Sequence, residues 1–310
     1  MPGTSESGLV IDVAELHKRY GRVRALAGLT MTVQAGEIFG FLGPNGAGKT
    51  TAVKLLLGLA RPTGGHGLVL GRPLGDREAR RHVGYLPELF RFQPWLRARE
   101  VLDLHADLIG LPAGGRRRTF DDVLGLVGLA DRADSAVGGF SKGMQQRLGI
   151  GVALVGDPAL VILDEPTSAL DPIGRMDVRA ILRTARERGA AVLLNSHLLT
   201  EVEQVCDRLA IVDRGAVVAE GTLAAVLGAR ETRIRVEGLE RPGLAALSRF
   251  GTPRFDGRDL FVGELPEASV PELVAALVEM GVRVHEVASG RESLEARFLE
   301  LVRTNREVVA

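Results

Sequence analysis

The sequence predicts an α/β fold built around a parallel sheet, followed by a small α+β domain. Two patterns predict the α/β part. A buried strand at 37–42 is followed by a glycine-rich turn and by helical apolar spacing over 50–59. A wholly apolar strand at 160–163 precedes helical spacing over 172–187 and a further strand at 190–194. Wholly apolar strands are typical of parallel sheets, because helices cover both of their faces.

The remaining elements of the α/β part follow from the same spacing rules. Residues 8–36 alternate as short strands with a turn near Tyr20-Gly21, and 98–130 have the spacing of two helices broken at 112–115. A further helix at 141–155 stops at Gly156-Asp157-Pro158. Residues 209–212 and 216–219 predict a closing hairpin.

The pattern of the chain changes after about residue 228. Ile234 and Val236 alternate with polar residues, and 260–262 is strand-like. Apolar residues over 270–278 follow the i, i+3, i+4, i+7 spacing of an amphipathic helix. A last helical stripe covers 294–302. We therefore expect a first domain at 1–228 and a small α+β domain at 229–310.

Composition excludes several classes of protein. The 310 residues carry 39 Lys+Arg and 39 Asp+Glu, so bulk positive charge gives no reason to expect nucleic acid as a partner. The single cysteine, Cys206, excludes an internal disulfide framework and favours a reducing compartment. No apolar run reaches the roughly 18–20 residues that a bilayer requires, and the N-terminus lacks a signal-peptide pattern. We expect a chain that stays in the cytoplasm.

The most specific motif is Gly43-Pro-Asn-Gly-Ala-Gly-Lys-Thr50, which fits G-x-x-x-x-G-K-[ST] between a predicted strand and a predicted helix. Glycines let backbone N–H groups point into a concavity that holds phosphate oxygens. The start of the following helix adds partial positive charge. In such a loop Lys49 reaches the terminal phosphates and Thr50 places its hydroxyl on Mg²⁺. The motif therefore predicts a phosphate-binding loop.

Asp164-Glu165 ends the apolar strand 160–163, where ligands bind in open α/β sheets. One carboxylate can hold Mg²⁺ through water, and the other can polarise an attacking water. A pair of surface acids at the end of a strand is the alternative. His197 follows the next strand and can reach a terminal phosphate, or it simply begins a helix.

Gly139-Phe-Ser-Lys-Gly-Met144 opens the helix at 141–155. Ser141 can cap this helix, and Gly143 permits a close approach of another molecule, so the helix start is a candidate second anion site. An ordinary capped helix is the alternative.

The order of these motifs resembles that of the ATP-binding subunit of an ABC transporter. A phosphate loop at 43–50 is followed by a signature at 140–144, Asp164-Glu165, Ser168-Ala-Leu-Asp171 and His197. The likeness covers roughly residues 8–225. It implies a P-loop NTPase of the ABC-type ATPase fold, with a RecA-like core, an antiparallel β subdomain and a helical subdomain at about 89–157.

The resemblance implies a role for each site residue. Tyr20 stacks on adenine, Glu165 is the general base, His197 contacts the γ-phosphate, and Asp171 lies in a loop at a dimer interface. The ATP-binding set comprises Tyr20, Gly43, Pro44, Asn45, Gly46, Ala47, Gly48, Lys49, Thr50, Thr51, Glu88 and Asp164. The Mg²⁺ ligands are Thr50, Glu88 and, through water, Asp164. The signature that covers ATP held by a second copy is Ser141, Lys142, Gly143 and Met144.

Two positions depart from the usual family pattern. Lys142 replaces the first glycine of the signature, and Glu88 replaces the glutamine of the lid loop. A carboxylate can still face Mg²⁺, although it adds negative charge near the phosphates. Both variants resemble the branch of type-2 exporters, whose membrane subunit is a separate chain.

The resemblance implies an ATPase that works as a homodimer on the cytoplasmic face of the membrane. ATP-driven closure and reopening of the dimer would power export through an integral-membrane permease, and 229–310 would serve dimerisation or regulation. The aromatic residues Phe90, Phe92 and Trp95 either border the groove for the permease or pack internally. An importer subunit is one alternative function. A soluble ABC-type ATPase acting on ribosomes or DNA is another, although the chain has one cassette and no heptad array.

Overall fold

The computed structural model describes residues 8–168, 170–228, 231–263, 265–290 and 293–308. The chain divides into two compact units, Met1–Leu223 with Leu301–Ala310, and Ala224–Glu300. The boundary at Leu223 lies close to the one expected near residue 228, but the last ten residues group with the first unit. No helix within the described residues is both long and apolar enough to cross a bilayer.

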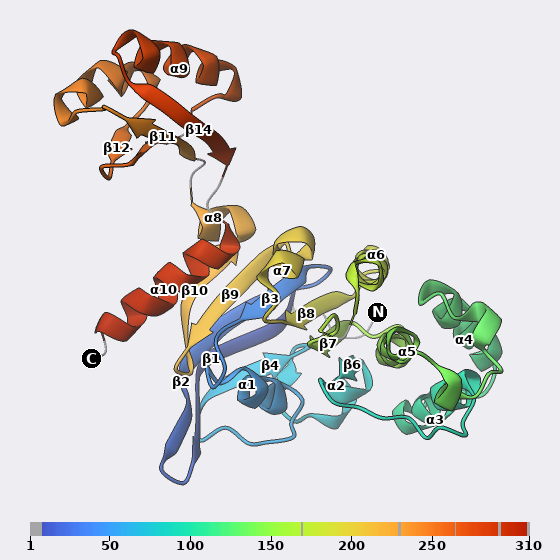
Figure 1. Cartoon of the computed structure of the whole chain (residues 1–310). Helices are drawn as coiled ribbons and strands as arrows, with labels where there is room; N and C mark the ends of the chain where they lie inside the picture. Colours follow the sequence, from blue (N-terminus) through green and yellow to red (C-terminus); the bar gives the residue numbers. More distant parts are fainter. Residues whose placement is uncertain (1–7, 169, 229–230, 264, 291–292, 309–310) are drawn as a thin grey trace. The chain divides into compact units, whose positions relative to one another are not determined.

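A six-stranded sheet forms the centre of the first unit, in the order β10-β9-β3-β8-β7-β6 (Figure 1). Its strands are β3 (Ile38–Leu42), β6 (Val83–Leu86), β7 (Leu160–Asp164), β8 (Ala191–Asn195), β9 (Arg208–Asp213) and β10 (Ala216–Thr222). All pairings are parallel except that of β9 with β10. Every residue of β3, β7 and β8 is buried, as the sequence predicted for β3 and β7.

A second, antiparallel sheet has the order β2-β1-β4-β5. Its strands are β1 (Leu9–Tyr20), β2 (Val23–Gln34), β4 (Gly64–Val69) and β5 (Arg72–Pro73). The expectation of short strands over 8–36 is wrong, because β1 and β2 are each twelve residues long. Shifts in register interrupt their alternation, one of them beside Glu15 with its φ of 52°, so the pattern looks shorter than the strands are.

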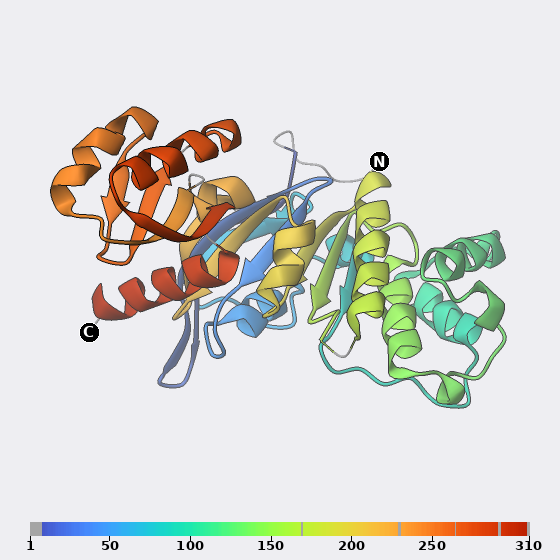
Figure 2. The same cartoon turned by 45° about the horizontal axis from the view of Figure 1, so that its top comes forward.

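Helices complete the layers of the first unit. Phe39 and Phe41 of β3 share one core with the antiparallel sheet and with Ala52 and Val53 of α1 (Lys49–Leu56). The helix α1 ends before the predicted Leu59. The other helices are α2 (Arg77–Arg81), α3 (Ala98–Ile109), α4 (Arg116–Leu126), α5 (Lys142–Leu154), α6 (Pro172–Glu187) and α7 (Leu199–Val205), with single 3₁₀ turns at Ala130–Arg132 and Val137–Gly139. Figure 2 shows α3, α4 and α5 gathered beyond the β6 end of the central sheet.

The second unit contains a βαββαβ arrangement, the split βαβ pattern. Its sheet has the order β12-β13-β11-β14, with all pairings antiparallel. The elements are α8 (Leu223–Leu227), β11 (Glu231–Glu237), a 3₁₀ helix at Arg241–Phe250, β12 (Pro253–Phe255), β13 (Asp259–Gly263), a 3₁₀ turn at Glu267–Ser269, α9 (Val270–Glu279), β14 (Arg283–Gly290) and the start of α10 (Leu294–Val308). Ile234 and Val236 of β11 pack on Leu273 and Leu277 of α9 in one core.

Candidate nucleotide site

The loop at 43–48 joins β3 to α1 and is held in shape by its glycines. Gly46 and Gly48 have φ of 80° and 104°, a region that side chains disfavour. A Cβ on Gly48 would lie 2.5 Å from Ala25 O, and one on Gly43 would overlap Val212 O. The backbone therefore approaches its neighbours at distances that only glycine allows, which leaves the N–H groups at the start of α1 available to a phosphate.

Lys49 is the first residue of α1, and its side chain lies over the loop. Its Nζ donates to Gly43 O at 2.7 Å and to Pro44 O at 3.3 Å. Burial lowers the pKa of Lys49, and the nearby carboxylates of Glu165, Asp164 and Glu88 oppose that change. The loop residues Asn45, Gly46 and Thr50 are exposed, whereas Ala47 is buried and Thr51 half-buried.

Asp164 is the last residue of β7 and lies among other acids. Asn195 Nδ2, at the end of the neighbouring β8, donates to Asp164 Oδ1 at 2.5 Å. Burial is the main cause that raises the pKa of Asp164, with further contributions from the negative charges of Glu88 and Glu165. Three carboxylates therefore face a single ammonium group, that of Lys49, in this part of the described structure.

The next residue, Glu165, has a φ of 53°, which is uncommon for a residue with a side chain. Its N–H donates to Asn195 O at 2.8 Å, and its carbonyl accepts the Ser168 hydroxyl at 3.1 Å. These bonds stabilise a backbone turn that otherwise costs on the order of 1 kcal/mol or more. The turn lets two successive carboxylates project separately from the end of one strand.

Glu165 contacts His197 through both carboxylate oxygens. The backbone N–H of His197 donates to Oε1 at 2.9 Å, and His197 Nδ1 lies 2.7 Å from Oε2. The carboxyl of Glu165 is buried, whereas the side chain of His197 is 58% exposed. A buried carboxylate beside a solvent-exposed histidine can accept a proton from a water molecule and orient that water for attack.

The oxygen donors at the site suit Mg²⁺. Thr50, Glu88 and Asp164 offer a hydroxyl and two carboxylates, and the surplus of negative charge favours a divalent cation. The described residues contain no group of three or more His, Cys, Asp or Glu side chains that could hold a metal ion alone. In proteins Mg²⁺ is usually bound by one or two carboxylates together with substrate phosphates, and Glu88 and Asp164 are such carboxylates.

Tyr20 ends β1, and about half of its surface is exposed. Lys18 Nζ lies 4.8 Å from the centre of the Tyr20 ring and donates to Arg61 O at 2.7 Å. The ring therefore has one cationic neighbour and an open surface on which a base can stack. The sequence pattern did not point to Lys18.

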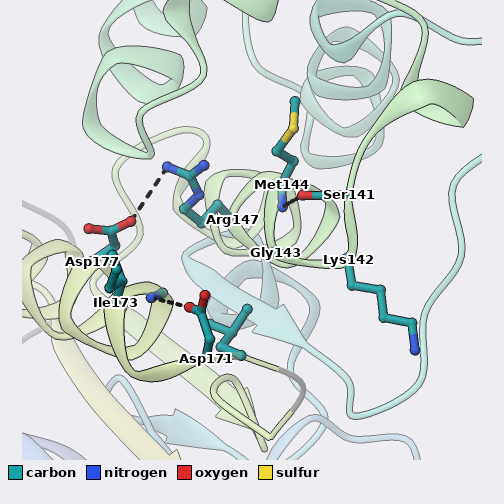
Figure 3. Close-up of a pocket in the computed structure, with 10 residues that line it drawn as sticks. Ser141, Lys142, Gly143, Met144, Arg147, Asp171, Ile173 and Asp177 are labelled. Atoms are coloured by element: carbon teal, nitrogen blue, oxygen red, sulfur yellow. Dashed lines mark hydrogen bonds and ion pairs between the residues drawn. The ribbon is translucent and has the colours of Figure 1, made fainter.

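The signature residues lie in a separate pocket of about 420 Å³ (Figure 3). Ser141 caps α5 by accepting the Met144 N–H at 3.2 Å, and Asp171 caps α6 by accepting the Gly174 N–H at 2.7 Å. The described residues that line the pocket are Ser141, Lys142, Gly143, Met144, Arg147, Leu170, Asp171, Ile173, Gly174 and Asp177. Ala169, in the same motif as Asp171, lies outside the described residues.

Side chains in this pocket differ in direction. Lys142 extends away from Asp171, whereas Arg147 and Asp177 face each other at 3.8 Å (Figure 3). The sequence analysis missed Arg147, Ile173 and Asp177, which join the pocket because α5 and α6 begin side by side. It also missed Asn195, whose only signal was its position at the end of a parallel strand two residues before His197.

A glycine loop between a parallel strand and a helix, with a lysine and carboxylates at neighbouring strand ends, defines the P-loop class of nucleotide-binding proteins. Residues 26–168 match the family model described as ABC transporter. An uncharacterized ABC transporter ATP-binding protein of Synechocystis sp. is 40% identical over 304 residues, which cover 95% of this chain and 85% of that protein. The chain belongs to the family of ABC transporter ATP-binding proteins, as its motifs predicted.

Other relatives and solved structures agree with this assignment. The Nod factor export ATP-binding protein I of Burkholderia orbicola is 40% identical over 219 residues, or 70% of this chain and 72% of that protein. The ATP-binding subunit of an ABC transporter matches with a TM-score of 0.64 and 34% identity, covering 70% of this chain and 91% of that one. A dimeric bacterial ABC transporter cassette matches with a TM-score of 0.62 and 25% identity, covering 69% and 99%. The predicted α/β P-loop fold is confirmed.

Proposed function

We propose that the chain hydrolyses ATP as a homodimer and thereby powers export through a separate integral-membrane permease. The observation that carries this proposal is the placement of Glu165. Its backbone turns the carboxylate out of the end of β7, and both of its oxygens contact His197. A buried carboxylate near the phosphate loop is suited to act as a general base toward water.

In this mechanism the phosphate loop and its lysine hold the triphosphate. Lys49 Nζ, which lies within hydrogen-bond distance of the carbonyls of Gly43 and Pro44, binds phosphate oxygens together with the N–H groups at the start of α1. Glu165 accepts a proton from the water that attacks the γ-phosphate, and His197 holds the γ-phosphate in place. Mg²⁺, held by Thr50, Glu88 and Asp164, supplies positive charge to the phosphates when it is bound.

A second copy of the chain completes the site. The pocket of the signature is lined by described residues of 141–147 and 170–177, whereas the phosphate loop lies before α1. In the proposed dimer, a nucleotide held by Lys49 meets Ser141 and Gly143 of another subunit, with Asp171 at the shared interface. The similarity to a dimeric cassette supports this arrangement. ATP joins the two copies, and its cleavage reopens them.

The direction of transport and the membrane partner are supported by two observations. A relative with 40% identity is named for Nod factor export. Leu89 and Trp95, which follow Glu88, are 88% and 73% exposed, whereas Phe90 and Phe92 are half-buried with ring centres 5.3 Å apart. Exposed apolar side chains that follow Glu88 in the sequence are suited to receive a cytoplasmic helix of the permease. The protein would then work at the cytoplasmic face of the membrane.

The substitution Glu165→Gln tests the proposal. It preserves the shape of the side chain and removes the base, so hydrolysis should fall about 10²- to 10⁴-fold while ATP stays bound and a dimer accumulates with it. Phosphate release and light scattering after gel filtration measure the two effects. Glu187→Gln, an exposed residue at the end of α6, is the matched control. Wild-type turnover in Glu165→Gln would contradict the role of Glu165.

A further inference from the structure

The last helix, α10, contacts the end of a strand of the central sheet. Asn305 Nδ2 donates to Asp213 Oδ2 at 2.8 Å. Asp213 is the last residue of β9 and is only 3% exposed. The closest cation to it in the described structure is Arg214, whose Nε is 4.0 Å away. A buried carboxylate needs donors to offset its desolvation, and Asn305 is one of them.

The turn that follows Asp213 packs on the phosphate loop. Arg214 and Gly215 both have a left-handed backbone, with φ of 50° and 81°. Gly215 N–H donates to Ala47 O at 2.8 Å, and Gly215 O accepts Ala27 N–H at 2.8 Å. A Cβ on Gly215 would lie 2.7 Å from Leu26 Cα. The turn is therefore held tightly on both sides, and one of its bonds fixes a carbonyl in the middle of the phosphate loop.

From this chain of contacts we infer that Asn305 and Asp213 are positioning residues for the phosphate loop. Asn305 holds the carboxylate of Asp213, which sets the start of the turn, and Gly215 in turn orients the peptide of Ala47. Small displacements of groups that bind a substrate weaken their effect strongly. This inference rests on the proposed binding of ATP by the loop.

The helix that carries Asn305 has a second anchor. Arg297 Nε donates to Val226 O at 3.1 Å, and both residues belong to the second compact unit. The residues of α10 from Leu301 onward belong to the first unit. Within the first unit, the anchor of these residues is the bond from Asn305 to Asp213.

Binding of a fluorescent ATP analogue to the full chain tests the inference. Asn305→Ala should weaken binding about fivefold, because Asp213 loses the hydrogen bond from Asn305 that helps to position the loop. The unfolding midpoint without nucleotide should change little. Arg303→Ala, an exposed residue on the same helix, is the matched control. Equal affinity in the two variants would overturn the inference, as would an affinity loss in Asn305→Ala that only follows a general loss of stability.

A swap of the two side chains is a sharper second test. Asn305→Asp alone places two carboxylates together, and Asp213→Asn alone removes the acceptor charge, so each should weaken binding. The double variant restores one amide and one carboxylate and should recover most of the affinity. Absence of recovery would overturn the direct contact. If the unaltered chain bound no ATP analogue at all, the proposed function would fail together with this inference.

Discussion

The central sheet of the first unit and the sheet of the second unit use polar residues in different ways. In the first unit β7 is buried over its whole length, and polar side chains lie where strands end, at Asp164, Asn195 and Asp213. In the second unit β11 alternates buried and exposed residues, and its polar side chains lie along the strand. Parallel strands therefore collect polar groups at one edge, where they meet, whereas an antiparallel strand spreads them over a solvated face.

The polar pairs of the second unit fit this description. Arg233 and Arg235 on β11 each lie 3.1 Å from an oxygen of Glu286 on β14, and all three are substantially exposed. Such surface pairs contribute about 0–1 kcal/mol each. Nothing in these pairs resembles the crowded carboxylates around Asp164. The first unit thus gathers carboxylates at one edge of a sheet, whereas the second unit places its charged pairs on the surface around an apolar core.

The largest effect that distinguishes the two units is expected from Leu277→Ala, as a loss of stability in the second unit. Leu277 is fully buried in the core of the second unit, so its truncation should lower the free energy of unfolding of that unit by about 2–5 kcal/mol. Hydrogen exchange resolved by segment measures this loss. Val278→Ala, on a side chain that is 59% exposed, is the control. ATP affinity should stay unchanged in both variants. A lower ATP affinity in Leu277→Ala alone would show that ATP binding depends on the second unit.

Next in size is the effect of Lys49→Ala on the first unit. The variant loses the ammonium group that faces three carboxylates. With it goes a charged hydrogen bond to phosphate, which contributes about 1.5–3 kcal/mol to binding. ATP affinity measured by calorimetry should fall about 10- to 100-fold. Lys54→Ala on the exposed side of the same helix should bind as the unaltered chain does. Similar affinities in the two variants would remove Lys49 from the site.

The smallest effect concerns the stability of the first unit. Because burial raises the pKa of Asp164, the folded chain holds that proton more strongly than the unfolded chain, and ionisation of Asp164 destabilises the fold. Asp164→Asn should therefore raise the unfolding midpoint at neutral pH without nucleotide, while hydrolysis falls. The gain should shrink as the pH falls toward the ordinary carboxyl value of 3.8.

Thermal unfolding at several pH values measures this gain, and Asp122→Asn, an exposed residue of α4, is the control. A midpoint that drops at neutral pH in Asp164→Asn would show that the charge stabilises the apo fold. The ionised carboxylate of Asp164 would then not destabilise the fold.

Local spacing in the sequence was enough to predict the phosphate loop at 43–50, the helix at 172–187 and the buried strand before Asp164. These predictions succeed because a glycine turn, a cap and an apolar period act over a few neighbouring residues. The bend of β1 at Glu15 escaped prediction, since a shift of register depends on the partner strand. The sequence also failed to predict Arg147, Ile173 and Asp177 in the signature pocket, because these residues come from two helices that pack together.

The sequence by itself determined the class of the fold and the family, and it predicted the residues proposed to bind and cleave a nucleotide, because each lies in a short motif whose chemistry depends on near neighbours. Tertiary structure alone decided which of those groups meet. Asn195 reaches Asp164 from the adjacent strand, Glu165 contacts His197 across 32 positions, and Asn305 reaches Asp213 across 92. Contacts at such separations arise from the packing of whole elements, and no local pattern encodes them.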